Sequence, residues 1–227
     1  MKILLLADIH GYENELKEIL KGPFNEIDLV ICAGDLTDMY RIPEGFSQAD
    51  MVDTILQKMF VLNKPLLCIP GNHDPYESID VFESYGVNLH NKIRKIKGIE
   101  FLGFGGAETP FNTIFEPTEQ EIEKSLAKHK PTPSNFILVV HQPPKNTKQD
   151  RLSTGQHAGS AVIRKYILEK QPMLATSGHI HEGQGVDYLN KTVLFNPGPV
   201  FEGKYGIIDI EDKKVTCKVK TAALAGK

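Results

Sequence analysis

The chain has 227 residues, of which 41% are hydrophobic and 24% charged, enough apolar material for one hydrophobic core. Its formal net charge of -3 gives no overall attraction to nucleic acid or to an anionic membrane surface. The sequence has no apolar run near the roughly 20 residues of a membrane span. Its three cysteines lack close spacing, which argues against a disulfide framework and a cysteine-type zinc site. We therefore expect a cytoplasmic protein that does not bind membranes.

The first third of the chain alternates between strand and helix patterns. Continuous apolar runs predict buried strands over Lys2–Ala7, Asp28–Ala33 and Leu66–Ile69. Apolar residues at helical spacing predict helices between them, over Glu13–Lys21 and Gln48–Leu62. This βαβαβ order predicts parallel strands joined by right-handed crossovers.

The rest of the chain is predicted to contain shorter elements. The expected strands are Ile93–Ile96, Glu100–Phe104, Phe136–Val140, Met173–Ser177, Val186–Tyr188, Val193–Phe195, Tyr205–Ile210 and Val215–Val219. Helices are expected over Glu119–Lys128 and Ala161–Lys170, the second with Ser160 as N-cap. The strands from Met173 onward are expected to form a meander, and Thr221–Lys227 a mobile tail. Without repeats or a long linker, residues 1–227 are predicted to be a single α/β domain of two facing sheets with helices outside.

Five short polar motifs each follow an apolar, strand-like run. They are Asp8-Ile9-His10, Gly34-Asp35, Gly71-Asn72-His73-Asp74, His141 in Val-Val-His-Gln, and Gly178-His179-Ile180-His181. Open α/β sheets place their sites at the carboxyl ends of strands. Oxygen and imidazole donors together suit Mn, Fe, Zn, Co or Ni better than Ca or Mg. A single Asp-x-His pair is most often structural, but five such motifs with glycines at the turns predict one shared two-metal hydrolytic site.

These motifs resemble those of the calcineurin-like metallophosphoesterases, which read D-x-H, G-D-x-x-D, G-N-H-[DE], H and G-H-x-H. The second motif runs Gly34-Asp35-Leu36-Thr37-Asp38 here, and the match extends from Asp8 to His181. The resemblance implies a metallophosphoesterase-type sandwich of two facing mixed β-sheets flanked by helices. It also implies two divalent metal ions, with Mn the first candidate and Ni, Fe, Co or Zn as alternatives. The ligands it implies are Asp35 between both ions, Asp8, His10 and His181 on one ion, and Asn72, His141 and His179 on the other.

By the same resemblance His73 is not a ligand. We expect a metal-bridging hydroxide to attack phosphorus in line while His73 stabilises the transition state and protonates the leaving oxygen. Asp38 matches the family carboxylate that orients this histidine and raises its pKa, and Asp74 is a second candidate for that role. Two carboxylate ligands leave two divalent ions with a net positive charge, which attracts a phosphate ester.

The expected activity is hydrolysis of a small phosphodiester, with a phosphomonoester also open. A nuclease acting on DNA or RNA is one alternative, and a non-catalytic metal-binding scaffold of the same fold is another. The substrate pocket is expected to come from three loops, Thr37–Ser47, Gly105–Pro117 and Gln142–Gly159. The candidate phosphate contacts in these loops are Arg41, Lys145, Lys148 and Arg151.

Several positions are expected to be structural. His90 is predicted to lie on the surface, and His157 to brace its loop rather than to reach the metal pocket. The turn Asn196-Pro197-Gly198-Pro199 is expected to support the site from beneath. The oligomeric state stays open, and a homodimer is compatible with the sequence.

Overall fold

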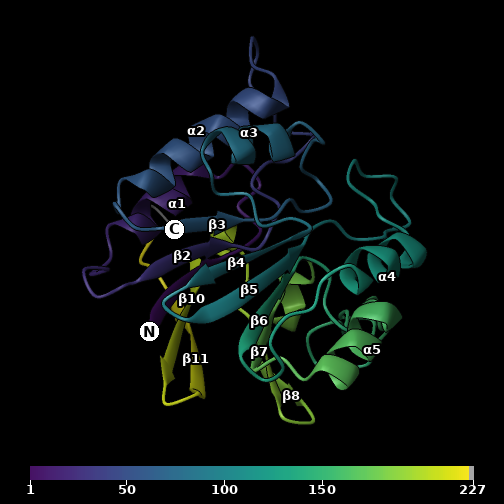
Figure 1. The fold of residues 1–227 in the computed structure, drawn as a ribbon. Coiled ribbons are helices and arrows are strands. Elements are labelled where there is room, and N and C mark those ends of the chain that lie inside the picture. The colour runs from purple at the N-terminus through teal and green to yellow at the C-terminus, as the bar shows by residue number, and fades with distance from the viewer. Residues whose placement is uncertain (225–227) are drawn as a thin grey trace.

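The computed structural model describes residues 1–224, and Figure 1 shows its fold. The elements of the first part are β1 (Lys2–Leu6), α1 (Glu13–Leu20), β2 (Leu29–Cys32), α2 (Gln48–Phe60), β3 (Leu66–Cys68) and α3 (Ser78–Ser84). The next are β4 (Lys92–Ile96), β5 (Ile99–Phe104), α4 (Glu119–Ala127), β6 (Phe136–Val140), α5 (Ala161–Lys170) and β7 (Leu174–Thr176). The last are η1 (His181–Gly183), β8 (Gly185–Leu189), β9 (Thr192–Asn196), η2 (Val200–Glu202), β10 (Lys204–Glu211) and β11 (Lys214–Thr221).

The predicted strands and helices are all present, with ends that differ by one or two residues. Ser160 caps α5 as predicted, since its hydroxyl accepts the backbone N–H of Ile163 at 3.0 Å. The helix α3 was not predicted. Its large buried side chain is Phe82, and the other buried position is Ser78, so the segment lacks the apolar periodicity that marks an amphipathic helix.

The strands form two mixed sheets, in the orders β11-β10-β1-β2-β3 and β4-β5-β6-β7-β9-β8. The strands β1, β2 and β3 are parallel, as the βαβαβ pattern predicts. The predicted meander is wrong. β7 pairs in parallel with β9, β8 and β9 form a hairpin, and β10 crosses to the other sheet to pair antiparallel with β1. In this position Ile208 and Ile210 are buried between the sheets.

Apolar side chains fill three layers. The middle layer lies between the sheets, where Ile3 and Leu5 of β1 join Phe101, Ile137 and Val139 of the second sheet in one cluster. The helices α1 to α3 cover the outer face of the first sheet, and α4 and α5 cover the second (Figure 1). The structure therefore confirms a sandwich of two facing sheets with helices outside.

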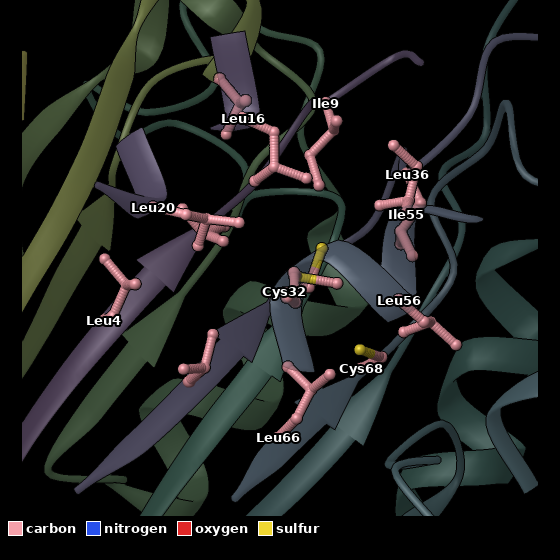
Figure 2. Packing of buried hydrophobic residues seen from close by; sticks show 14 of the residues in the cluster. Leu4, Ile9, Leu16, Leu20, Cys32, Leu36, Ile55, Leu56, Leu66 and Cys68 are labelled. Carbon is pink, nitrogen blue, oxygen red and sulfur yellow. The ribbon is translucent and has the colours of Figure 1, made fainter. Parts of the chain in front are cut away.

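Figure 2 shows side chains of the layer beneath α1 and α2, where Leu16 and Ile55 belong to one cluster with the strand residues Leu4 and Cys32. Burial of this layer is complete at each of these four side chains. It fixes β1 and β2 side by side, and so fixes the positions at which both strands end.

The predicted mobile tail is wrong at its start. Thr221 is the last residue of β11, and the backbone N–H of Ala222 donates to the carbonyl of Gly203 at 2.8 Å. Residues 225–227 lie outside the described part of the chain. No described helix has the length and apolar character needed to cross a membrane.

Candidate metal centre

The five polar motifs meet at one edge of the sandwich, because each follows the carboxyl end of a strand. β1, β2 and β3 of the first sheet deliver the first three motifs, and β6 and β7 of the second sheet deliver the other two. Four of the motif residues adopt left-handed backbone conformations: Asp8, His10, Asp35 and His179, with φ of 55°, 49°, 52° and 67°. Such conformations cost free energy in residues other than glycine, and they cluster at functional sites.

Asp35 lies at the centre of the group. Its Oδ2 atom is 3.5 Å from Nε2 of His10 and 3.3 Å from Nε2 of His141. Its Oδ1 atom accepts the backbone N–H of His73 at 2.8 Å. The side chain is buried, so a carboxylate oxygen is held between two imidazoles that come from different sheets.

One set of donor atoms lies on the β1 side. Asp8, His10 and His181 each offer one atom within 4.8 Å of the others, and Nε2 of His181 is 3.9 Å from Oδ1 of Asp8. The backbone N–H of His179 donates to Asp8 Oδ1 at 3.0 Å, which holds the carboxylate toward this set.

A second set lies on the β6 side. Its members, Asp35, His141 and His179, each offer one atom within 4.8 Å of the others. Nδ1 of His141 donates to the carbonyl of Ala33 at 2.8 Å, so its Nε2 carries the free lone pair that a metal requires. Oδ1 of Asn72 lies 3.0 Å from that Nε2.

The amide of Asn72 is oriented from the opposite side. Its Nδ2 donates to Oγ1 of Thr113 at 3.1 Å, which leaves Oδ1 as the atom that faces His141. An amide oxygen and an imidazole nitrogen at this spacing are suited to sharing one ion.

Four buried atoms of Asp8, His10 and His73 have no hydrogen-bond partner among the described residues. These atoms are Oδ2 of Asp8, both ring nitrogens of His10 and Nδ1 of His73. Buried polar atoms are almost always paired, because an unpaired one costs about 1–3 kcal/mol. A divalent ion within the β1 set would pair Oδ2 of Asp8 and one ring nitrogen of His10, so the residues present fit a metal centre.

The electrostatics of the site favour an ionised Asp35 beside a protonated His141, with His10 and His179 neutral. Desolvation lowers the pKa of His179 to about 3 and also lowers the pKa of His10. Burial opposes ionisation of Asp35, yet the neighbouring His141 and His10 hold its pKa below the ordinary value. Burial also disfavours the charged form of His141, but Asp35 raises its pKa to about 9. A metal ion at Nε2 of His141 therefore replaces a proton.

Glycines allow the motifs to approach one another. A Cβ atom on Gly71 would lie 2.0 Å from Oδ1 of Asp35, and one on Gly34 would lie 2.5 Å from Nδ1 of His141. Gly34 also has a φ of +99°, a conformation that L-residues with side chains rarely adopt. Glycine at position 71 therefore lets the turn after β3 pack on Asp35 of the turn after β2, and glycine at position 34 lets the turn after β2 meet His141 of the second sheet.

The two carboxylates considered as partners of His73 have different surroundings. Oδ1 of Asp38 lies 3.4 Å from Nδ1 of His73. Asp74 is fully buried and accepts hydrogen bonds from the N–H groups of Leu36, Thr37 and Gly71. Burial and the nearby Asp35 raise the pKa of Asp74 to about 6. Asp38 therefore lies beside His73, whereas the carboxylate of Asp74 faces the backbone of the motifs that begin at Gly34 and Gly71.

A pocket of about 740 Å³ opens over the donor atoms. Its lining includes the apolar side chains of Phe111, Leu152 and Ile180 and the acidic side chains of Glu108 and Glu182. Two of the three predicted loops, 105–117 and 142–159, contribute to it. The loop 37–47 contributes none of the lining residues, which is a correction to the sequence prediction.

The candidate phosphate contacts lie outside the lining of this pocket. None of the four basic residues, Arg41, Lys145, Lys148 and Arg151, lines this pocket. Arg41 instead stacks on the ring of Tyr12 at 3.9 Å. His157 does brace its loop, since its Nδ1 lies 2.7 Å from Oδ1 of Asp150, but it also lines the pocket, contrary to the prediction.

Other supporting residues were not recognisable in the sequence. Ala33 and Thr113 orient ligands through contacts that no local pattern marks, and Phe201 of η2 packs its ring 4.9 Å from His181. The turn at 196–199 supports the site as predicted, because Asn196 Nδ2 donates to the carbonyls of Gly178 and Ile180.

His90 is a further correction, since it is not a surface residue. Its Nδ1 atom accepts the backbone N–H of Gly105 at 2.9 Å, and its ring lies 5.0 Å from the ring of Phe104. The half-buried ring therefore supports the start of the 105–117 loop. A hydrogen bond between distant segments leaves no mark in the local sequence.

Comparison with known proteins gives similarities in both sequence and fold. Residues 1–183 match the family model described as calcineurin-like phosphoesterase. The uncharacterised protein MJ1162 of Methanocaldococcus jannaschii is 33% identical over 221 residues, which cover 93% of this chain and 96% of that protein.

Two solved structures share the fold. The protein TT1561 of Thermus thermophilus is 18% identical with a TM-score of 0.69, covering 96% of this chain and 97% of its own. A dimetal phosphatase from Danio rerio is 12% identical with a TM-score of 0.67, covering 97% of this chain and 96% of its own.

Proposed function

Because this chain belongs to the calcineurin-like phosphoesterase family and is a metal-dependent phosphoric ester hydrolase, we propose that it hydrolyses a small phosphodiester at a site for two divalent ions. The observation that carries the proposal is the position of Asp35, whose Oδ2 lies within 3.5 Å of imidazoles from both donor sets. A single carboxylate oxygen in that position is suited to bridging two ions.

We assign the ligands as the two donor sets suggest. Asp8, His10 and His181 would hold one ion, Asn72, His141 and His179 the other, and Asp35 both. When bound, two such ions supply a hydroxide nucleophile at neutral pH and neutralise the charge of the phosphate. The mixture of oxygen and imidazole donors fits Mn, and Ni, Fe, Co and Zn are the alternatives to test.

His73 supplies the proton in this proposal. It lines the pocket, and it adjoins the β1 set with its ring centroid 5.0 Å from that of His10. A proton donated from this imidazole to the leaving oxygen would accelerate the departure of the alcohol. Asp38, whose Oδ1 lies 3.4 Å from Nδ1 of His73, would orient the ring.

The pocket favours a small ester over a nucleic acid. No Lys or Arg is among the described residues that line it, while Glu108 and Glu182 are. Binding of DNA or RNA depends on several cationic contacts with backbone phosphates, which this rim does not offer. Apolar walls at Phe111, Leu152 and Ile180 suit the organic part of an ester with a single phosphate. A phosphomonoester is the second candidate, because the same walls accept its one organic group.

We place the protein in the cytoplasm. Cys32, Cys68 and Cys217 are free thiols. Unpaired cysteines are typical of a reducing compartment.

The test is hydrolysis of bis-p-nitrophenyl phosphate and p-nitrophenyl phosphate by chelated protein, restored separately with Mn, Ni, Co, Zn or Mg. We expect metal-dependent turnover with a higher kcat/KM for the diester. Turnover of the monoester alone would contradict the diester assignment, and activity that persists after chelation would contradict the metal-dependent mechanism.

A further inference from the structure

His157 combines a fixed ring with an exposed edge. Its Nδ1 lies 2.7 Å from Oδ1 of Asp150, a carboxylate with no exposed surface. Asp150 also accepts the backbone N–H groups of Asn146, Thr147 and Gly159 at 2.8–3.1 Å. Burial would raise the pKa of Asp150, but the hydrogen bonds from His157 and these N–H groups lower it. Asp150 is therefore an anion held in place by hydrogen bonds from these four groups.

The backbone around His157 is equally constrained. Arg151 and His157 form an antiparallel bridge, and Ala158 N–H donates to the carbonyl of Asp150 at 2.9 Å. The turn between them is closed by the N–H of Leu152, which donates to the carbonyl of Gln156 at 2.9 Å. The ring of His157 thus has both its main chain and one of its nitrogens held in place.

The second ring nitrogen has no assigned partner. The His157 side chain is 35% exposed and lines the same pocket as His10, Asp35, Asn72 and His179. Its Nε2 makes no hydrogen bond to any described residue. His157 also belongs to neither donor set, nor to the third group of described side chains whose donor atoms converge within 4.8 Å, which is His10, Asp38 and His73. His157 therefore lines the pocket without belonging to a group of converging donor atoms.

Few other side chains of the pocket can donate to a phosphate. The described lining contains no Lys or Arg, and the hydroxyl of Thr109 already donates to Glu116. Gln156 is exposed and its side chain makes no hydrogen bond to the described chain. Outside the metal motifs, His157 is the described lining residue that offers a nitrogen held in a fixed direction by a buried carboxylate.

We propose that His157 is a substrate-binding residue that donates Nε2–H to a phosphoryl oxygen of the ester, with Asp150 as its positioning residue. The assignment rests on the proposed function. A ring between the Asp150 carboxylate and a phosphoryl oxygen donates from both nitrogens when it is doubly protonated. The contact supplies the cationic hydrogen bond that the acidic and apolar rim otherwise lacks.

Two substitutions separate this role from simple bracing of the loop. In His157→Asn the amide nitrogen lies where Nδ1 lies, so the bond to Asp150 is kept and the nitrogen that faces the pocket is lost. In His157→Gln the amide nitrogen reaches the position of Nε2, so a donor to the substrate is kept and the bond to Asp150 is lost. His129, whose Nε2 contacts Asn91 outside this pocket, gives the matched control His129→Asn.

The first readout is calorimetric titration of the metal-loaded proteins with methylphosphonate, which carries phosphoryl oxygens and has no ester bond to hydrolyse. The loss of a charge-assisted hydrogen bond is expected to weaken binding about tenfold in His157→Asn. We expect a smaller loss in His157→Gln and none in His129→Asn. The melting temperature and metal content of His157→Asn should equal those of the wild type.

The second readout is hydrolysis of bis-p-nitrophenyl phosphate, where His157→Asn should raise KM about tenfold. Binding and KM unchanged in His157→Asn, with losses in His157→Gln, would overturn the proposal and leave His157 with a bracing role alone. Absence of turnover by the wild type with every metal would refute the proposed function, whereas the methylphosphonate titration would still decide the role of His157.

Discussion

Nδ1 of His73 lies 3.4 Å from Oδ1 of Asp38, whereas the carboxylate of the adjacent residue Asp74 turns away from that ring. Asp74 accepts hydrogen bonds from the N–H groups of Leu36 and Gly71 and from the hydroxyl of Thr37. The two carboxylates that were candidates for orienting His73 thus have different tasks. One faces the proposed acid, and the other holds two metal-binding turns together.

Replacement of His73 by Ala should remove turnover without removing the metals. A general acid typically contributes about 10²–10⁴-fold to the rate, so kcat for a diester should fall within that range. Metal content should stay at the wild-type level, because the proposed ligands are all intact. Steady-state kinetics together with elemental analysis provide the measurement. Loss of the metals in His73→Ala would show that His73 is a ligand.

Asp74→Asn should destabilise the fold. The amide that replaces the carboxylate presents a donor to N–H groups that need an acceptor, and a buried donor left unpaired costs about 1–3 kcal/mol. The free energy of unfolding in urea should fall by about that amount. Asp38→Asn is the matched control, since Asp38 is part-exposed, and it should leave stability unchanged while it lowers kcat. Equal stability of the two variants would contradict the structural role of Asp74.

The five motifs could be predicted because each is local in sequence. A buried strand followed by Gly34-Asp35 or by Gly71-Asn72-His73 is visible in the residues themselves. The contacts that orient these ligands are distant. His141 and the carbonyl of Ala33 are 108 residues apart, and Asn72 and Thr113 are 41 residues apart, so no local pattern marks either pair.

The errors in the fold prediction have the same origin. The strand pattern of β10 is correct. Its antiparallel pairing with β1 is a tertiary contact, which the local sequence pattern does not show. Lys145 and Arg151 were candidate phosphate contacts because they lie in the loop 142–159. In the structure that loop presents Leu152 and His157 to the pocket, and its basic side chains lie outside the lining.

Gly71→Ala should abolish metal binding with only a partial loss of stability. The added Cβ would lie 2.0 Å from Oδ1 of Asp35, which displaces the carboxylate proposed to bridge the ions. We expect a clear loss of bound metal relative to the wild type, as measured by elemental analysis after dialysis. Gly86→Ala is the control, because its Cβ meets no atom within 4 Å and Gly86 is remote from the pocket. A wild-type metal content in Gly71→Ala would contradict the close packing of these turns.

His90 should make stability depend on pH. Burial lowers its pKa from 6.5 to about 4, so the folded chain prefers the neutral ring and binds fewer protons than the unfolded chain. Its contribution is therefore complete above the unfolded pKa of 6.5 and is lost as the pH falls from there to about 4. In His90→Asn the amide oxygen can still accept the N–H of Gly105, but nothing titrates there.

Urea denaturation at about pH 7 and about pH 5 measures this effect. The unfolding free energy of the wild type should fall by about 1–2 kcal/mol more than that of His90→Asn between these values. Parallel losses in the two proteins would show that His90 titrates equally in the folded and unfolded chains.

The number of ions needed for turnover tests the central claim most directly. Chelated protein is titrated with Mn while hydrolysis of bis-p-nitrophenyl phosphate is followed, and the titration is repeated with Asp35→Asn. The account predicts that activity rises until two ions are bound per chain and that the variant is inactive. Full activity with a single ion, or activity retained without Asp35, would contradict a two-metal site built on that carboxylate.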